Sequence, residues 1–284
     1  AGHQVYYFSF EMFRERIEQS GAVFIGCDGY DFDMEDKGNA DRVGKDKTFA
    51  TELLVSSTLA LDEMTTKKIE EIRPDIIVSD SVAFWGKLVA KYFQPCSETF
   101  SDRYHFIGPS IRPITKTYEK TAKKTVYISM GTVNQDREFY RNCIRELGQT
   151  DWQVIISMGT NTEHFDNLPA NIQIYESVDQ MAVLSIADAF ITHCGMNSAS
   201  EGLYFKVPLV LFPQTPEQGA VARRTEELGA GIRLKSISED DILQSLKSVL
   251  YEQEYKESAI KISDSFRACG GPTEAGTFLE EIIM

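Results

Sequence analysis

The stretch AFITHCGMNSASEGLYFKVPLVLF (189–212) decides the fold. It opens with an apolar run, AFIT (189–192), that suits a buried strand, and it closes with a second apolar run, PLVLF (208–212). Between them, a polar turn leads into a helical pattern over 198–204. A strand, a helix and a second strand in this order form the unit that links two parallel strands through a crossover helix. The sequence therefore predicts an α/β protein with a parallel sheet.

The same alternation of short apolar runs and longer amphipathic runs extends in both directions from this stretch. Strands are expected at 5–8, 22–25, 76–79, 125–130, 153–157, 172–175, 189–192, 208–212 and 231–234. Helices are expected at 11–19, 48–72, 83–92, 137–147, 180–187, 198–204 and 217–228, and within 242–284. Nearly continuous apolar strands separated by helices indicate parallel sheets that are covered on both faces.

Two such arrays meet near IGPSIRPITKT (107–117), where Pro109 and Pro113 suit a linker. The predicted domains are therefore residues 1–113 and 114–265, followed by a helical tail over 266–284. A chain of 284 residues is long enough for two ordinary domains.

Composition narrows the classes of partner. The net charge of −14 argues against a sequence-independent grip on nucleic acid, which needs clustered Lys and Arg, and against an anionic membrane surface. The apolar runs are too short to form a membrane anchor, and no secretory leader is visible. Five widely spaced cysteines suggest a reducing compartment, so a cytoplasmic location is expected.

Ligands of doubly wound sheets bind beyond the carboxyl ends of the strands. This rule places four polar loops at one edge of the second predicted sheet: ISMGT (128–132), SVDQ (177–180), THCGMNS (192–198) and PQTPEQ (213–218). The carboxyl edge of this sheet is therefore the predicted ligand site.

The loop HCGMNSASEG (193–202) suggests an anionic ligand. Asn197 or Ser198 can cap the following helix, whose outward N–H groups attract phosphate. Gly195 permits close backbone approach, and His193 can donate a hydrogen bond to a phosphate oxygen. The alternative is a capping box, S-x-x-E, formed by Ser198 and Glu201 with no ligand. That alternative leaves His193 and Gly195 unexplained.

The loop QTPEQ (214–218) is open to two interpretations. Thr215 as N-cap, Pro216 at the first helical position and Gln218 three residues after the cap make a good helix start. An adjacent acid and amide, Glu217 and Gln218, can also hydrogen-bond the vicinal hydroxyls of a sugar.

The segment THCGMNSASEGLYFKVPLVLFPQTPEQ closely resembles the donor-binding signature of the family 1 glycosyltransferases, which are UDP-sugar-dependent enzymes with the GT-B fold. The segments ISMGTV, VDQMAVLSIADAFITHCG and ELGAGIRL resemble other parts of the family, as do GHQVYYFSFEMFRERIEQSGA and PDIIVSDSVAFWGKLVAK in the first array. Within that family, the sequence most resembles the bacterial macrolide glycosyltransferase subfamily. The resemblance implies two Rossmann-like, doubly wound parallel-sheet domains that face a cleft, with the C-terminal helix returning to the N-terminal domain.

The resemblance also implies a role for each matching residue. His193 would contact the donor phosphates, Glu201 would accept hydrogen bonds from the ribose hydroxyls, and Gln180 would lie at the nucleobase pocket. Relatives often have an aromatic residue three positions before that glutamine, where this chain has Ser177. The remaining donor-binding residues would contact the phosphates or the transferred sugar: Ser129, Gly131, Thr132, Gly195, Asn197, Ser198, Glu217 and Gln218.

The implied reaction is inverting transfer of a hexose from a UDP-sugar to a hydroxyl of a lipophilic small molecule, such as a macrolide or flavonoid. The family uses no metal and no cofactor beyond the UDP-sugar co-substrate. The base is a histidine in the first βα loop, which is expected upstream of residue 1, and Asp80 matches the position that supports it. An internal acceptor-lining segment of the relatives also has no counterpart near 95–110.

Two other functions stay open, a UDP-sugar 2-epimerase-like enzyme and a non-catalytic nucleotide-sugar binding module. The epimerases lack the paired Glu-Gln at the end of the PQTPEQ loop. The acidic loop DGYDFDMED (28–36) contains Asp31-Phe32-Asp33, which is similar to a DxD metal motif, but it is interpreted as a solvated charge run. No metal site is predicted.

Overall fold

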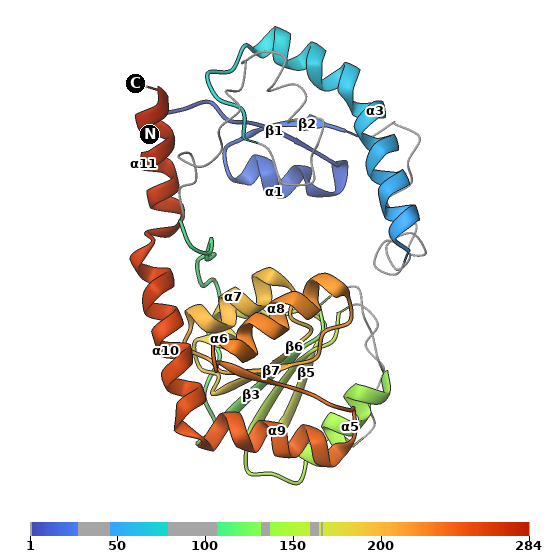
Figure 1. Ribbon diagram of the computed structural model, residues 1–284, viewed down its shortest axis with the longest axis vertical. Helices are drawn as coiled ribbons and strands as arrows, with labels where there is room; N and C mark the ends of the chain where they lie inside the picture. The colour runs from blue at the N-terminus through green and yellow to red at the C-terminus, as the bar shows by residue number, and fades with distance from the viewer. Residues whose placement is uncertain are drawn as a thin grey trace. The chain divides into compact units, whose positions relative to one another are not determined.

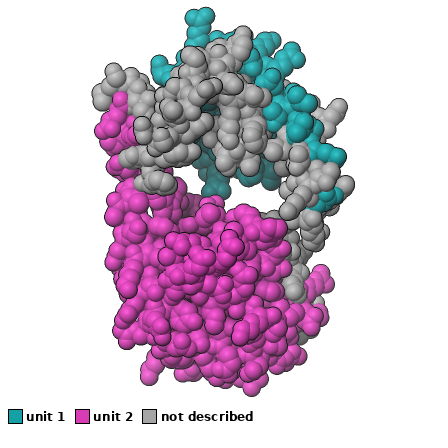
Figure 2. Space-filling view, in the orientation of Figure 1, with its two compact units in different colours: residues 1–103, 283 teal, residues 104–282, 284 magenta. Residues whose placement is uncertain are grey.

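The computed structural model describes residues 2–27, 46–78, 107–131, 137–159, 165 and 167–283. The chain divides into two compact units, residues 1–103 and residues 104–282 (Figure 2). The boundary expected from sequence, at 113/114, falls inside the second unit. The segment 107–117 therefore belongs to the second unit.

The first unit contains a short parallel sheet and a long helix. Its described elements are β1 (Tyr6–Ser9), the 3₁₀ helix η1 (Glu11–Phe13), α1 (Arg14–Gln19), β2 (Val23–Gly26) and α3 (Lys47–Ile72). Strands β1 and β2 lie side by side (Figure 1). They pair in parallel, with Tyr6 opposite Val23. Helix α3 ends where the sequence predicts, because Arg73 adopts the left-handed conformation directly before Pro74.

One predicted element of this unit is wrong over its described part. Residues 76–78 of the strand expected at 76–79 do not pair with any described strand, and Val78 is 77% exposed. An apolar run becomes a strand only where a neighbouring strand supplies hydrogen-bond partners, and a sequence pattern cannot show that neighbour. Asp80, the acidic loop 28–36 and the helix expected at 83–92 lie outside the described residues.

The second unit alternates strands and helices as the sequence predicts. Its elements are β3 (Thr125–Ser129), α5 (Arg137–Leu147), β4 (Gln153–Ser157), β5 (Ile172–Tyr175), α6 (Gln180–Leu184), β6 (Ala189–Thr192), α7 (Met196–Tyr204), β7 (Leu209–Leu211), α8 (Pro216–Glu227), β8 (Gly231–Arg233), α9 (Glu239–Tyr251), α10 (Gln253–Ala268) and α11 (Gly271–Ile283). Helix α6 is shorter than the expected 180–187.

The strands described in this unit form one parallel sheet with the order β5-β4-β3-β6-β7-β8. This is the doubly wound order, in which the chain moves outward in one direction from the first strand and then returns to build in the other. The direction changes between β3 and β6, which lie side by side with Ser129 opposite Thr192. The predicted doubly wound sheet is therefore confirmed, and it has a topological switch point between β3 and β6.

Alternate residues of each strand point to opposite faces of this sheet, and helices cover both faces (Figure 1). Val126 and Ile128 lie in a buried cluster with Phe139 of α5 and Leu246 of α9. Tyr127 lies in a second buried cluster, between the sheet and helices α6, α7, α8 and α10. The burial of apolar side chains on both faces explains why the strands read as nearly continuous apolar runs.

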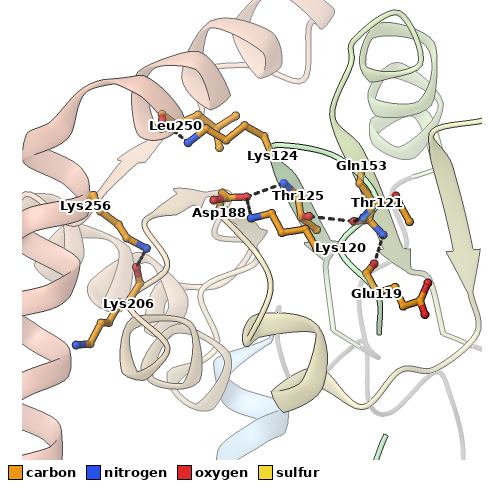
Figure 3. A network of polar contacts seen from close by, with 10 residues as sticks. All are labelled: Glu119, Lys120, Thr121, Lys124, Thr125, Gln153, Asp188, Lys206, Leu250 and Lys256. Carbon is orange, nitrogen blue, oxygen red and sulfur yellow. Dashed lines mark hydrogen bonds and ion pairs between the residues drawn. The ribbon is translucent and has the colours of Figure 1, made fainter. Parts of the chain in front are cut away.

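A polar network fixes the segment before β3 to the amino-terminal edge of the sheet (Figure 3). Asp188 accepts hydrogen bonds from Nζ of Lys120 at 2.6 Å and from the N–H of Thr125 at 2.7 Å. Oε1 of Gln153 accepts from the N–H of Thr121 at 3.0 Å and from the hydroxyl of Thr125 at 3.0 Å. These contacts hold the entry to β3, so the segment 107–124 approaches the sheet along a defined path.

Asp179, the N-cap of α6, holds the same segment further upstream. Its Oδ1 accepts from the N–H of Ala182 at 3.1 Å. Its Oδ2 accepts from the N–H of Thr115 at 2.6 Å, from the hydroxyl of Thr115 at 2.6 Å and from the N–H of Lys116 at 3.0 Å. Burial raises the pKa of Asp179, but these hydrogen bonds outweigh it and lower the pKa from 3.8 to about 2.

We expect Asp179→Asn to lower the free energy of unfolding by about 1–2 kcal/mol, because an amide nitrogen would face the Thr115 and Lys116 donors. Because the pKa is lowered in the folded chain, the carboxylate stabilises it fully above pH 3.8, and this contribution is lost as the pH falls toward 2. Urea unfolding at pH 7 and at pH 3 measures the effect. The difference in the free energy of unfolding between the wild-type protein and Asp179→Asn should be smaller at pH 3 than at pH 7. Asp151→Asn, at an exposed loop carboxylate, is the control. An equal effect of both variants would contradict the prediction.

The C-terminal tail is helical, as expected, but it is broken once. Helix α10 ends at Ala268. Gly270, between the two helices, has φ of 80°, and Gly271, the first residue of α11, has φ of 64°. Only glycine adopts such angles without strain, so the pair separates the two helices. The expected return of 266–284 to the N-terminal domain stays a prediction. Among the described helices, none has a stretch apolar and long enough to cross a membrane.

Candidate functional site

The predicted ligand loops gather at the carboxyl edge of the sheet because all its described strands run parallel. Ser129 ends β3, and His193 directly follows β6, the neighbouring strand. The two segments leave the sheet side by side at the switch point, where neighbouring loops diverge and leave room for a ligand. The site can therefore be described outward from His193.

Two glycines enclose the His193 imidazole. A Cβ atom added to Gly131 would lie 2.8 Å from Cε1 of His193, and one added to Gly195 would lie 2.7 Å from Nε2. Gly131 also has φ of 73°, which disfavours any other residue. The sequence predicts that Gly195 allows backbone to approach a ligand, whereas the structure shows that both glycines leave space for the histidine ring.

The environment of His193 favours a neutral imidazole. Nδ1 is buried and makes no hydrogen bond of good geometry with the residues that the structure describes. Burial lowers the pKa of His193 below 6.5, and the Ser129 backbone offsets part of this shift. At neutral pH the ring is therefore a hydrogen-bond donor or acceptor instead of a cation.

Helix α7 begins earlier than the sequence suggests. The predicted cap, Asn197 or Ser198, is wrong, because Gly195 is the N-cap and no side chain caps the helix. Asn197 and Ser198 therefore lie in the first turn, where the backbone N–H groups have no acceptor within the helix. An uncapped helix start carries about half a positive charge and favours an anion.

The capping-box alternative for Ser198 and Glu201 is also excluded, because Glu201 has other partners. Oε2 of Glu201 accepts from Nε2 of Gln180 at 2.5 Å, and Oε1 accepts from Nη2 of Arg112 at 3.3 Å. The Glu201 side chain is only 8% exposed. Glu201 follows Asn197 by four residues, so both lie on the same side of α7.

Gln180 connects this carboxylate to the core of the sheet. Its Oε1 accepts from the hydroxyl of Tyr127 at 3.0 Å, while its Nε2 donates to Glu201. Tyr127 is buried and stacks on Phe190, with ring centroids 4.7 Å apart. Burial raises the pKa of Tyr127 well above its usual range, so its hydroxyl remains a donor. The amide of Gln180 is thereby held with its nitrogen toward Glu201.

The loop before α8 forms the helix start that the sequence predicts. The hydroxyl of Thr215 accepts from the N–H of Gln218 at 3.3 Å, and Pro216 is the first helical residue. Oε1 of Gln218 accepts from the N–H of Gln214 at 2.8 Å, which leaves its Nε2 for other contacts. Glu217 is exposed.

Two predicted site residues, Asp80 and Thr132, lie outside the described residues. Two others were missed by sequence reasoning, Arg112 and Tyr127. Arg112 lies 89 residues from Glu201 along the chain, so no local pattern could connect them. Within the described part of the chain, no three His, Cys, Asp or Glu side chains gather as a metal site requires.

The carboxyl edge of the sheet carries hydrogen-bond donors in one place and a hydrogen-bond acceptor in another. The start of α7 and His193 can donate hydrogen bonds to an anion, and Glu201 can accept hydrogen bonds from hydroxyl groups. A nucleoside diphosphate presents both groups, because its phosphates are anionic and its ribose carries vicinal hydroxyls.

Comparison with known proteins places the chain in a family. Residues 141–282, half of the chain, match the family model described as erythromycin biosynthesis protein CIII-like, C-terminal domain. The NDP-glycosyltransferase YjiC of Bacillus licheniformis is 38% identical over 204 residues, 67% of this chain and 51% of that protein. The demethyllactenocin mycarosyltransferase of Streptomyces fradiae is 27% identical over 241 residues, 79% of this chain and 52% of that protein. The chain thus spans about half the length of the curated relatives it matches.

The fold is shared with solved glycosyltransferase structures. The crystal structure of the glycotransferase of kitacinnamycin matches with a TM-score of 0.84 at 19% identity, over 99% of this chain and 92% of that chain. At this identity the match concerns the fold alone. The chain therefore belongs to the erythromycin biosynthesis protein CIII-like family, among the macrolide-type family 1 glycosyltransferases with the GT-B fold.

Proposed function

We propose that the full-length protein transfers a hexose from a UDP-sugar to a hydroxyl of a lipophilic small molecule, such as a macrolide or flavonoid. The transfer inverts the anomeric carbon and uses no metal ion. Binding of the UDP-sugar donor is inferred from one observation above all. Helix α7 starts without a side-chain cap, after His193 at the switch point. Family membership supports sugar transfer, and the two relatives are named as an NDP-glycosyltransferase and a mycarosyltransferase.

The residues of the second unit would act on the donor. The acceptor oxygen forms a bond to the anomeric carbon while the bond from that carbon to the phosphate oxygen breaks. UDP leaves with the electron pair, and the N–H groups at the start of α7 and His193 hydrogen-bond the phosphate as its charge develops. The hydroxyl proton passes to a base, which we assign to a histidine supported by Asp80. Glu217 and Gln218 would bind the hexose.

Two measurements test this function. Isothermal titration calorimetry should show UDP binding at least about tenfold tighter than uridine, because hydrogen bonds to a charged group contribute about 1.5–3 kcal/mol. The full-length protein, given UDP-glucose and hydroxylated macrolides and flavonoids, should form β-linked glucosides, as judged by the anomeric proton coupling, and EDTA should not reduce the rate. Equal binding of UDP and uridine would contradict the phosphate site, and an EDTA-sensitive rate would contradict metal independence.

The same assays separate the two alternative functions. UDP binding without transfer or donor hydrolysis would favour a non-catalytic nucleotide-sugar binding module. Conversion of the donor to its C2 epimer without an acceptor would favour an epimerase-like enzyme. Either result would replace the transfer proposal while retaining the donor site.

A further inference from the structure

The segment 107–117 brings a cation to the buried carboxylate of the candidate donor site. Nη2 of Arg112 lies 3.3 Å from Oε1 of Glu201. The Arg112 side chain is 54% exposed, whereas that of Glu201 is 8% exposed. Water can therefore reach the Arg112 side chain, whereas it hardly reaches the Glu201 side chain.

The two oxygens of Glu201 are held by different kinds of partner. Oε2 is bonded to Gln180, which is itself fixed by the buried hydroxyl of Tyr127. Oε1 is bonded to the half-exposed Arg112. Solvent competes with Glu201 for the half-exposed Arg112 guanidinium, so this ion pair is weaker than one in which both members are buried from water. Oε1 is therefore the oxygen whose partner can be exchanged.

The position of Arg112 is fixed by the contacts of its neighbours in the segment 107–117. Ile111, directly before it, packs against the buried cluster around Tyr127. Three and four residues after it, Thr115 and Lys116 are bound by Asp179. Asp179 also caps the helix that begins with Gln180, so one residue positions both partners of Glu201.

We propose that Arg112 is a gate on the ribose-binding carboxylate. In the free protein its guanidinium occupies Oε1 of Glu201, and the ribose hydroxyls of a nucleoside diphosphate displace it. The donor must therefore compete with a residue of the chain itself. This weakens binding of every nucleotide that uses Glu201 and leaves nucleotides without ribose hydroxyls unaffected. The inference rests on the proposed function, which requires that a nucleoside diphosphate binds here.

The test compares UDP with 2′,3′-dideoxy-UDP in the wild-type protein and in Arg112→Met, which keeps most of the aliphatic side chain. The measured quantity is the ratio of the two dissociation constants. Loss of a nearby positive charge weakens both diphosphates alike, so it cancels in the ratio. Release of Glu201 should increase the preference for UDP about two- to fivefold, the range that an ion pair of this kind supports.

Two controls make the result specific. Lys116→Met removes a positive charge from the same segment, and the contact of Lys116 with Asp179 uses only its backbone N–H, so the ratio should not change. Raising the salt concentration weakens the ion pair. It should therefore increase the UDP preference of the wild-type protein and leave that of Arg112→Met unchanged.

An unchanged or reduced UDP preference in Arg112→Met, with normal UDP binding by the wild-type protein, would overturn the gate and leave the proposed function intact. A tenfold loss of affinity for both nucleotides in Arg112→Met, but not in Lys116→Met, would likewise overturn it, because Arg112 would then be a phosphate ligand. Absence of UDP binding by the wild-type protein would overturn both proposals.

Discussion

Gly195→Ala should weaken UDP binding about 10- to 150-fold, the largest effect we expect from adding one methyl group. The new Cβ atom would lie 2.7 Å from Nε2 of His193, which is closer than carbon and nitrogen atoms approach without a bond. The ring cannot move away freely, because Gly131 already approaches it from another direction. Displacement of His193 and of the first turn of α7 would remove the hydrogen bonds that we propose they donate to the UDP phosphates, and hydrogen bonds to charged groups contribute about 1.5–3 kcal/mol.

A double-mutant cycle shows whether this loss acts through the histidine. If the clash with the ring is the cause, Gly195→Ala should add little to the loss in a His193→Ala background. Gly276→Ala is the matched control, because its added Cβ atom meets nothing within 4 Å and its backbone is helical. Full UDP affinity in Gly195→Ala, or losses that add fully in the double variant, would show that the glycine does not act by making room for His193.

Glu201→Ala should reduce the affinity for UDP by tenfold or more while leaving that for 2′,3′-dideoxy-UDP nearly unchanged. In the proposed donor site the lost carboxylate would accept hydrogen bonds from the ribose hydroxyls, and hydrogen bonds to charged groups contribute about 1.5–3 kcal/mol. The change also leaves Nε2 of Gln180 without the acceptor that it has in the wild-type protein. Calorimetric titration with the two nucleotides measures the selectivity.

Stability must be measured beside binding, since a buried donor that loses its acceptor also costs about 1–3 kcal/mol of folding free energy. Urea unfolding gives this cost for Glu201→Ala, and Glu254→Ala, at an exposed carboxylate of α10, is the control for both measurements. An equal loss of affinity for both nucleotides would indicate a general distortion of the site instead of a lost ribose contact.

Much of the second unit follows from the sequence because its signals are local. Each strand is a short apolar run, and each helix has its own period and its own start, as Thr215, Pro216 and Gln218 show at α8. Parallel strands bring their following loops to one edge, so the sequence also places His193, Gly195 and Gln180 near one another. Prediction from the sequence is wrong where one local pattern is compatible with two different local structures. The pattern Ser198-x-x-Glu201 reads as a cap, although Gly195 starts the helix.

The sequence alone determined the alternation of strands and helices, the parallel sheet and the edge at which the polar loops gather. Only the tertiary structure decided the partners within that edge. The order of the strands places Gly131, which follows β3, against His193, which follows β6. The path of 107–117 brings Arg112 into hydrogen-bond contact with Glu201, which is 89 residues away along the chain. Periodic patterns report which face of an element is buried, but contacts between distant segments depend on how the elements are ordered in space, and no short stretch of sequence encodes that order.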